Sequence, residues 1–272
     1  MVPKSANEIF LSYSPANMLG FTDVFRRHPP PSLSSGPLAK DQTQDHGLKT
    51  VPHCQPCLLG TQFRHFLAAR RSAMTTRALF PTLLYESDLA DEALIADLAH
   101  SIRTLAQDDT AGRRWSRDHG YKGYTSYASL DDLPRRDPAF ADLAKLLVKH
   151  ATTFATDLAF DLAAKPKLDS LWVNLLKSGG QHSGHIHPHS ILSGTLYVEV
   201  PANAGAIRFE DPRLTQQMAA PPRRADAPDD RRAFVTVTAR PGQLLLWESY
   251  LRHEVLPGTA RADRLSISFN FA

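Results

Sequence analysis

The chain from residue 171 onward is a series of short apolar segments separated by turn-forming residues, and this pattern restricts the possible folds more than any other feature. The segments alternate apolar with polar positions or are rich in β-branched and aromatic residues, which predicts strands. They read 171-LWVNLLK, 191-ILSGTLYVEV, 206-AIRFE, 234-FVTVT, 243-QLLLW and 264-RLSISFNF. Turn sequences such as Gly179-Gly180 and Pro241-Gly242 separate them. Many short strands of this kind predict a β-sandwich or barrel.

Two amphipathic helices are expected before the strands. The segment 89-LADEALIADLAHSIRTL has apolar residues at helical spacing, and Ser87 or Asp88 is expected to be its N-cap. A second helix begins in 137-DPAFADLAKLLVKHATTFATDLAF, where Asp137 caps and Pro138 takes the first helical position. The Gly- and Tyr-rich segment 115–134 between them is expected to hold a short strand and a loop. Helices followed by many strands predict an α+β chain that is mainly β.

The first part of the chain differs in composition from the rest. Residues 1–73 include HPPPSLSSGPLAKDQTQDHG, which is rich in Pro, Ser and Gly and has no apolar period. Such a segment buries too little apolar surface to offset its ordering entropy, so we expect a disordered extension before a domain spanning 74–272. Met74 would then be the true translation start. Cys54 and Cys57 form a single CxxC with no second pair, and we interpret them as incidental thiols in a cytoplasmic protein.

Charge and hydropathy exclude several classes of partner. The formal net charge is +3, which is too small and too scattered to predict nucleic-acid binding. No apolar run approaches the roughly 20 residues that a membrane-spanning helix requires. The sequence therefore predicts a protein that acts neither on nucleic acid nor in a membrane.

A cluster of histidines lies between two of the predicted strands, in 181-QHSGHIHPHS-190. Side chains two positions apart share a face of a strand, so His185 and His187 are the preferred pair of metal ligands. His182 lies in a turn, and Pro188 separates His189 from the strand, so both are set aside. A third ligand is expected from His253, which follows the apolar strand QLLLW. Imidazoles gathered in this way indicate an open metal site.

At His253 the sequence resembles a known family. His253 is followed by Arg264-Leu-Ser266 on the last predicted strand, which resembles the C-terminal part of 2-oxoglutarate/Fe(II)-dependent oxygenases. The segment HEVLPGTARADRLSISFNF is similar to the corresponding part of prolyl hydroxylases. An HxHP…SG…YV pattern in HIHPHSILSGTLYVEVP is similar to a bacterial and phage branch. The resemblance runs from about Met74 to Ala272 and is strongest from Trp172.

The resemblance implies a fold, a reaction and a set of site residues. The fold would be a double-stranded β-helix, a jelly-roll of the cupin kind, with the N-terminal helices packed against it. The cofactors would be Fe(II), 2-oxoglutarate as cosubstrate and O2, and the reaction would be that of a dioxygenase, which couples the decarboxylation of 2-oxoglutarate to the hydroxylation of a substrate C–H bond. By resemblance, Arg264 would bind the distal carboxylate of 2-oxoglutarate, a role that its planar fork suits, with help from Ser266. Asn174 and Tyr197 would also contact the cosubstrate.

The metal ligands depart from the pattern of the family. The family uses a His-x-Asp/Glu motif, whereas this chain has His185-Ile-His187 and no Asp or Glu between Ser170 and Val198. His187 would then be a third imidazole ligand. The alternatives are that Glu210 or Asp211 supplies the carboxylate, or that water fills the position.

Several interpretations remain open beside the main one. The chain could be a cupin-like three-histidine dioxygenase without 2-oxoglutarate, or a non-enzymatic jelly-roll binding protein. The substrate could be a small molecule or a peptidyl side chain, and the polar segment 211–233 is expected to be a surface loop or lid. Arg208 and Arg213 are expected to pair with Glu210 and Asp211. Trp172 and Trp247 are expected in the core or a pocket wall.

Overall fold

The predicted strands pair into two antiparallel sheets in the computed structural model, which describes residues 76–213 and 216–272. The larger sheet has the strand order β1-β8-β5-β10-β3-β2. Its strands are β1 (Tyr85–Asp88), β2 (Gly123–Thr125), β3 (Leu168–Leu176), β5 (Leu192–Glu199), β8 (Gln243–Glu248) and β10 (Arg264–Phe271). β10 pairs with β3 on one side and β5 on the other, so the last strand of the chain lies inside the sheet.

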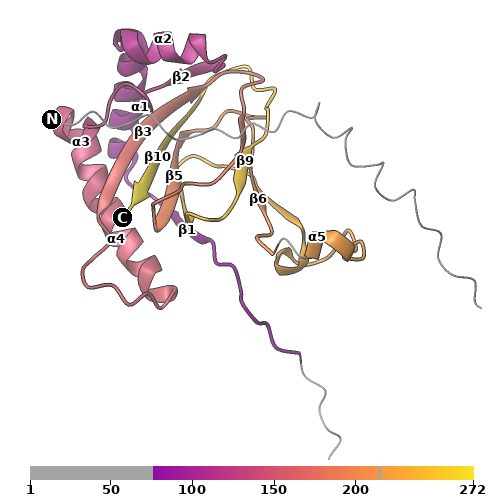
Figure 1. The fold of residues 1–272 in the computed structure, drawn as a ribbon. Coiled ribbons are helices and arrows are strands. Elements are labelled where there is room, and N and C mark those ends of the chain that lie inside the picture. Colours follow the sequence, from indigo (N-terminus) through magenta and orange to yellow (C-terminus); the bar gives the residue numbers. More distant parts are fainter. Residues whose placement is uncertain (1–75, 214–215) are drawn as a thin grey trace, which may run out of the picture. The chain divides into compact units, whose positions relative to one another are not determined.

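The smaller sheet has the order β4-β9-β6-β7 and lies on the side of the larger sheet away from the helices (Figure 1). Its strands are β4 (His182–His185), β6 (Ile207–Glu210), β7 (Phe234–Val237) and β9 (His253–Val255). β4 and β9 are short, and their pairing contains a register shift between His182 and His185. The sequence-based list of strands missed β1, β4 and β9, because segments this short have no resolvable alternation.

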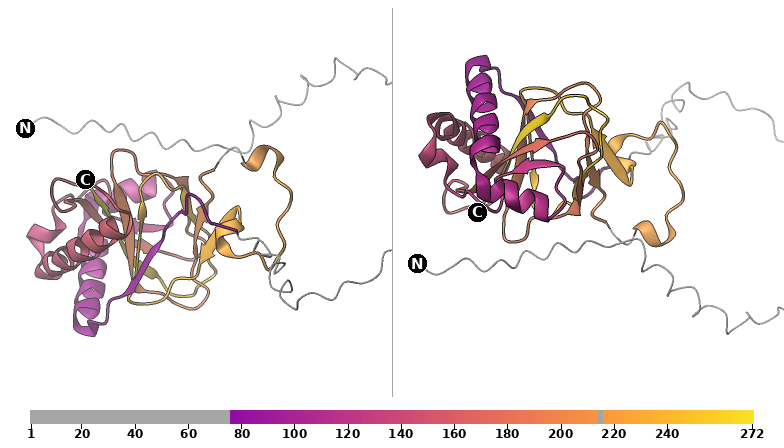
Figure 2. Two further views of the ribbon diagram at one scale, coloured as in Figure 1. Left: turned by 90° about the horizontal axis from the view of Figure 1, so that it is seen from below. Right: turned by 90° about the horizontal axis from the view of Figure 1, so that it is seen from above.

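Helices cover the outer face of the larger sheet, as both views in Figure 2 show. They are α1 (Glu92–Asp108), α2 (Thr110–Asp118), α3 (Leu133–Arg136) and α4 (Pro138–Asp157). The core between helices and sheet contains fully buried aliphatic and aromatic side chains, including Leu98, Ile102, Phe140, Leu147, Ile267 and Phe269. Burying each such side chain contributes about 1.5–3 kcal/mol. The expected α+β chain with N-terminal helices on a β core is thus confirmed.

The sequence of β10, RLSISFNF, alternates between residues on one face of the larger sheet and residues on the other. Its apolar residues belong to the core beneath the helices, and they are Leu265, Ile267, Phe269 and Phe271. The intervening residues face the smaller sheet, and they are Arg264, Ser266, Ser268 and Asn270. All four are polar or charged, although Arg264, Ser266 and Asn270 are buried. A polar inner face between two sheets indicates a site rather than a packed core.

Of the two helix caps expected from the sequence, one needs correction. Ser87 and Asp88 do not cap the first helix, because both lie in β1, paired with Leu244 and Gln243 of β8. Asp91 is the cap, and its carboxylate accepts a hydrogen bond from the Leu94 N–H at 3.0 Å. At the second helix the expected cap is confirmed, since the Asp137 carboxylate accepts from the Ala139 N–H at 2.8 Å.

The Gly- and Tyr-rich segment 115–134 holds the expected short strand, β2, but its first residues are helical. Trp115 to Asp118 are the end of α2, which begins at Thr110. The signal was hidden because this short helix is mostly polar and small, with Gly112 and Ser116 as its buried residues. Asp109 starts it by accepting a hydrogen bond from the Gly112 N–H at 3.0 Å.

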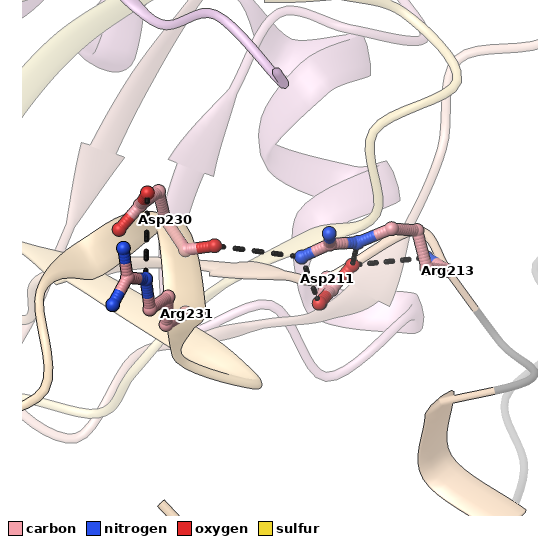
Figure 3. A network of polar contacts seen from close by, with 4 residues as sticks. All are labelled: Asp211, Arg213, Asp230 and Arg231. Carbon is pink, nitrogen blue, oxygen red and sulfur yellow. Dashed lines mark hydrogen bonds and ion pairs between the residues drawn. The ribbon is translucent and has the colours of Figure 1, made fainter. Parts of the chain in front are cut away.

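The segment 211–233 is mostly exposed, as expected of a surface loop. It contains two short helical turns, α5 (Gln216–Ala219) and η2 (Asp229–Arg231). Figure 3 shows how its two ends are connected: the Arg213 guanidinium donates to both Asp211 carboxylate oxygens and to the Asp230 carbonyl, and Arg231 pairs with Asp230.

Some predictions concern the part of the chain before residue 76. The disordered extension over 1–73, the translation start at Met74 and the Cys54–Cys57 thiols lie outside the described residues. Among the helices that the structure describes, none has the length and apolar character needed to cross a membrane.

Candidate metal centre

Three histidines from the smaller sheet gather at its inner face. His185 ends β4 and lies directly opposite His253, the first residue of β9. His187 follows two positions after the end of β4, and its backbone N–H donates to the Ser249 carbonyl at 3.0 Å. One nitrogen from each ring lies within 4.8 Å of the other two. The predicted trio is thus brought together, close enough for one ion to be shared after small rotations of the rings.

Hydrogen bonds fix the same tautomer in all three rings. The His185 Nδ1 lies 2.7 Å from the Ser183 carbonyl, and the His253 Nδ1 lies 2.9 Å from the Leu251 carbonyl. The His187 Nδ1 lies 2.7 Å from the side-chain oxygen of Asn270. Because each of these oxygens is an acceptor, each Nδ1 carries the hydrogen and each Nε2 keeps its lone pair. The His187 Nε2 is buried without a hydrogen-bond partner, so the donor set suits a metal ion.

Burial keeps the three imidazoles neutral, which metal binding requires. Desolvation, with a smaller contribution from the charge of His185, lowers the pKa of His187 to about 4. Desolvation also lowers the pKa of His185, and it lowers the pKa of His253 well below the usual value. At neutral pH all three rings therefore offer lone pairs rather than protons.

These depressed pKa values predict that acid destabilises the metal-free protein. The pKa of a histidine in the unfolded chain is near 6.5. In the folded chain, desolvation lowers the pKa of His187 to about 4 and that of His182 to about 3. The unfolded state binds more protons within this window, so the free energy of unfolding should fall by about a few kcal/mol between pH 6.5 and pH 4. Urea denaturation of the metal-free chain at several pH values measures this. An unfolding free energy that stayed constant over the window would contradict the burial of neutral imidazoles.

Arg264 is a buried cation on the inner face of β10. It is 3% exposed, and its Nη1 donates to the Gly205 carbonyl at 2.9 Å, while its Nε has no partner. Within the described ranges, 76–213 and 216–272, no carboxylate forms an ion pair with it. An unpaired buried charge costs several kcal/mol, so the fold retains this guanidinium at the expense of stability. Its unused donors are suited to an anionic ligand.

The other residues expected at the cosubstrate site lie beside Arg264. Ser266 pairs across the sheet with Asn174 of β3 and with Tyr197 of β5, so these three side chains form a row next to the arginine. The Arg264 guanidinium carbon lies 5.6 Å from the centre of the Tyr197 ring. Desolvation raises the pKa of Tyr197 to about 12, which keeps its phenol a neutral donor. The structure thus brings all four residues together.

The two acids considered as alternative ligands point elsewhere. In β6, Phe209 pairs with His253, so its neighbour Glu210 lies on the opposite face of the strand. The Glu210 carboxylate pairs with Arg252 at 3.0 Å. Asp211 accepts from Arg213, and this pairing lowers the pKa of Asp211. Neither acid belongs to the group of three histidines that could hold a metal among the described residues.

One of the expected ion pairs was assigned to the wrong acid. Arg213 pairs with Asp211 as expected, but Arg208 binds Glu254, which faces it across the β6–β9 pair. Glu210 forms its ion pair with Arg252 instead. Arg208 and Glu210 share a face of β6, but a residue directly opposite on the paired strand is nearer than a residue two positions along the same strand, so each pairs across toward β9.

Two tryptophans lie against the histidines, in positions consistent with a pocket wall. The Trp172 ring stacks at 5.9 Å from the His187 ring, and the Trp247 ring meets His253 edge-on at 4.7 Å. Trp247 is buried, whereas Trp172 is partly exposed. Of the histidines set aside, His189 is exposed in a turn with a positive φ of 70°.

Sequence reasoning missed three residues of this site. Tyr121, from the turn before β2, lies 2.9 Å from the His182 Nε2 and donates toward Asn174 at 3.3 Å. His182 is therefore a neighbour of the cosubstrate residues rather than a simple turn residue. Asn270 contacts His187 directly. The histidine motif gives no signal for Tyr121 or Asn270. The alternation in RLSISFNF does place Asn270 with the polar residues on the inner face of the larger sheet.

Comparison with protein families identifies the segment that carries the site. Residues 170–270 match the family described as "Putative 2OG-Fe(II) oxygenase". This segment contains all the proposed ligands and cosubstrate residues. No curated protein matches the chain.

Solved structures show the same architecture at low sequence identity. A prolyl-4-hydroxylase from Pseudomonas putida is 17% identical with a TM-score of 0.50, over 70% of this chain and 92% of that one. The non-heme alpha-ketoglutarate-dependent epimerase SnoN of nogalamycin biosynthesis is 16% identical with a TM-score of 0.50, over 71% of this chain and 78% of that one. These likenesses confirm the double-stranded β-helix core.

Proposed function

We propose that this chain, whose residues 170–270 match the family described as "Putative 2OG-Fe(II) oxygenase", is a 2-oxoglutarate- and Fe(II)-dependent dioxygenase that oxidises a C–H bond. One observation carries the proposal. Arg264 is a buried cation with no carboxylate partner among the described residues, and it lies on the face of the larger sheet that is turned toward the smaller sheet and its three neutral histidines. An anionic ligand that also binds a metal satisfies both features.

Each residue has a separate task in this proposal. His185, His187 and His253 would hold the iron through Nε2. Arg264 would bind the distal carboxylate of 2-oxoglutarate through two parallel hydrogen bonds, with Ser266, Tyr197 and Asn174 lining the space around it. Bound iron would couple the oxidative decarboxylation of 2-oxoglutarate by O2 to the oxidation of the substrate.

His187 as the third ligand changes the charge of the site. Three neutral imidazoles leave a divalent ion with its full charge of two, whereas the usual histidine pair with one carboxylate neutralises one unit. Together with Arg264, the centre would then be strongly cationic before the dianionic cosubstrate binds. This charge favours 2-oxoglutarate binding. The assignment of a third imidazole over Glu210 or Asp211 has separate support, because both acids already pair with arginines.

The substrate would be a small molecule or a peptidyl side chain. Two exposed side chains lie close in sequence to the ligands: Ile186 is 46% exposed and Tyr250 is 52% exposed. Because neighbouring residues alternate faces, Ile186 points away from the face that His185 and His187 share, so neither residue is assigned a contact with the substrate.

Product analysis separates this function from its alternatives. The purified full chain is incubated with Fe(II), 2-oxoglutarate and O2, and succinate is quantified. We expect succinate that requires all three components and is absent with His253→Ala. Oxygen consumption without succinate would instead indicate a three-histidine dioxygenase that does not use 2-oxoglutarate. Metal binding without consumption of either would indicate a binding protein.

A further inference from the structure

Asn270 is a buried amide of β10 whose contacts converge on His187. It is 9% exposed. Its Oδ1 accepts from the His187 Nδ1 at 2.7 Å and from the Ser193 hydroxyl at 2.8 Å. Its Nδ2 donates to the Ser170 hydroxyl at 3.1 Å. The serine hydroxyls can donate or accept, so the protonated His187 Nδ1 is the contact that directs the amide oxygen toward the imidazole.

The position of Asn270 is set by the sheet rather than by a flexible loop. In the register of the larger sheet it lies opposite Ser170 of β3 and Ser193 of β5. The Ser193 hydroxyl also contacts the Ser249 hydroxyl at 2.7 Å, and the Ser249 carbonyl accepts the backbone N–H of His187. The amide oxygen is therefore held in place before any metal binds.

His187 differs from the other two histidines in the source of its acceptor. His185 and His253 each use the main-chain carbonyl two residues earlier, a local contact that their own strand provides. His187 uses a side chain 83 residues away in sequence. Its orientation therefore depends on the identity of a single distant residue.

We propose that Asn270 is a positioning residue that orients the His187 Nε2 toward the metal. The His187 Nδ1–H donates to the amide oxygen, and the hydroxyls of Ser193 and Ser170 hold the amide in place from the two neighbouring strands. This inference rests on the metal centre of the proposed function but not on its turnover.

Cobalt binding tests the role without requiring catalysis. Metal-free wild type and variants are titrated with Co(II) by calorimetry, without 2-oxoglutarate, and the ligand-field absorption is recorded. Asn270→Ala should weaken Co(II) binding about 10- to 100-fold, the usual effect of losing a residue that orients a metal ligand. Asn270→Asp keeps an acceptor for the Nδ1–H, so it should bind within about threefold of wild type with a shifted absorption band.

A further variant provides the matched control. Ser170→Ala removes the contact to the Asn270 amide nitrogen but leaves the oxygen on His187, so it should bind nearly as wild type. Thermal unfolding of each metal-free variant separates loss of the fold from loss of orientation.

The outcomes decide the proposal. Wild-type affinity in Asn270→Ala, or equal losses in the Asp and Ala variants, would overturn the positioning role. A Ser170→Ala loss as large as that of Asn270→Ala would also overturn it. The expected cobalt series in a chain that releases no succinate would support the positioning role and reject the proposed function.

Discussion

Replacing Arg264 with methionine should strongly weaken 2-oxoglutarate binding while leaving the protein at least as stable as the wild type. Two charge-assisted hydrogen bonds and the pairing of a buried cation would be lost, which predicts that affinity falls about 100-fold or more. The stability should not suffer, because the buried guanidinium has no carboxylate partner among the described residues and methionine removes its desolvation cost. Calorimetry with the metal-loaded chain and thermal unfolding without ligand give the two readings.

A surface arginine provides the matched control for this substitution. Arg208 pairs with Glu254 on the smaller sheet and is partly exposed, so Arg208→Met should leave the 2-oxoglutarate affinity unchanged. Arg264→Lys should bind weakly, because an ammonium keeps the charge but cannot offer the planar fork. Undiminished 2-oxoglutarate binding by Arg264→Met would show that the cosubstrate, if there is one, binds elsewhere.

Substituting His253 should have the largest effect on metal binding. His253 is 4% exposed, with its Nδ1–H held by the Leu251 carbonyl, so its Nε2 is oriented before the metal binds. Loss of one of three protein ligands from such a site should weaken Fe(II) binding at least about 100-fold, more than the loss of a residue that only orients a ligand. Anaerobic Fe(II) titration of His253→Ala, with circular dichroism to confirm the fold, measures the loss.

The histidine cluster itself supplies the control for that experiment. His189 is exposed and has a positive φ of 70°, a backbone conformation that asparagine adopts readily. His189→Asn should therefore keep both the fold and the wild-type Fe(II) affinity. If His189→Asn lost as much Fe(II) affinity as His253→Ala, the assignment of His253 as a ligand and His189 as a residue without metal contact would be wrong.

The fold was predictable from the sequence where alternation is long and the strands are central. The sequence RLSISFNF separates a core face from a polar face along β10, and the segments that became β3, β5 and β8 were identified in the same way. The short strands β4 and β9 were not, because pairing rather than propensity makes them strands. The cap of α1 was misplaced for a related reason: β1 pairs with β8 and keeps Ser87 and Asp88 extended.

The site residues that belong to a recognisable sequence pattern could be predicted. The site residues that only strand pairing brings to the site could not. His185, His187, His253 and Arg264 follow from spacing and resemblance, and the structure gathers the three histidines at one point. Asn270 and Tyr121 lie far in sequence from the residues they contact, and only strand pairing and the turn before β2 place them there. The wrong partner for Arg208 has the same origin, since its acid lies on the neighbouring strand.

Anaerobic titration of the purified chain with Fe(II) and 2-oxoglutarate tests the central claim most directly. A 2-oxoglutarate molecule chelating iron at a three-histidine centre should produce a weak visible charge-transfer band that saturates with both components. The band should be missing in His253→Ala and present only at much higher 2-oxoglutarate concentrations in Arg264→Met. No band in the wild type, or a band of unchanged affinity in Arg264→Met, would contradict the account.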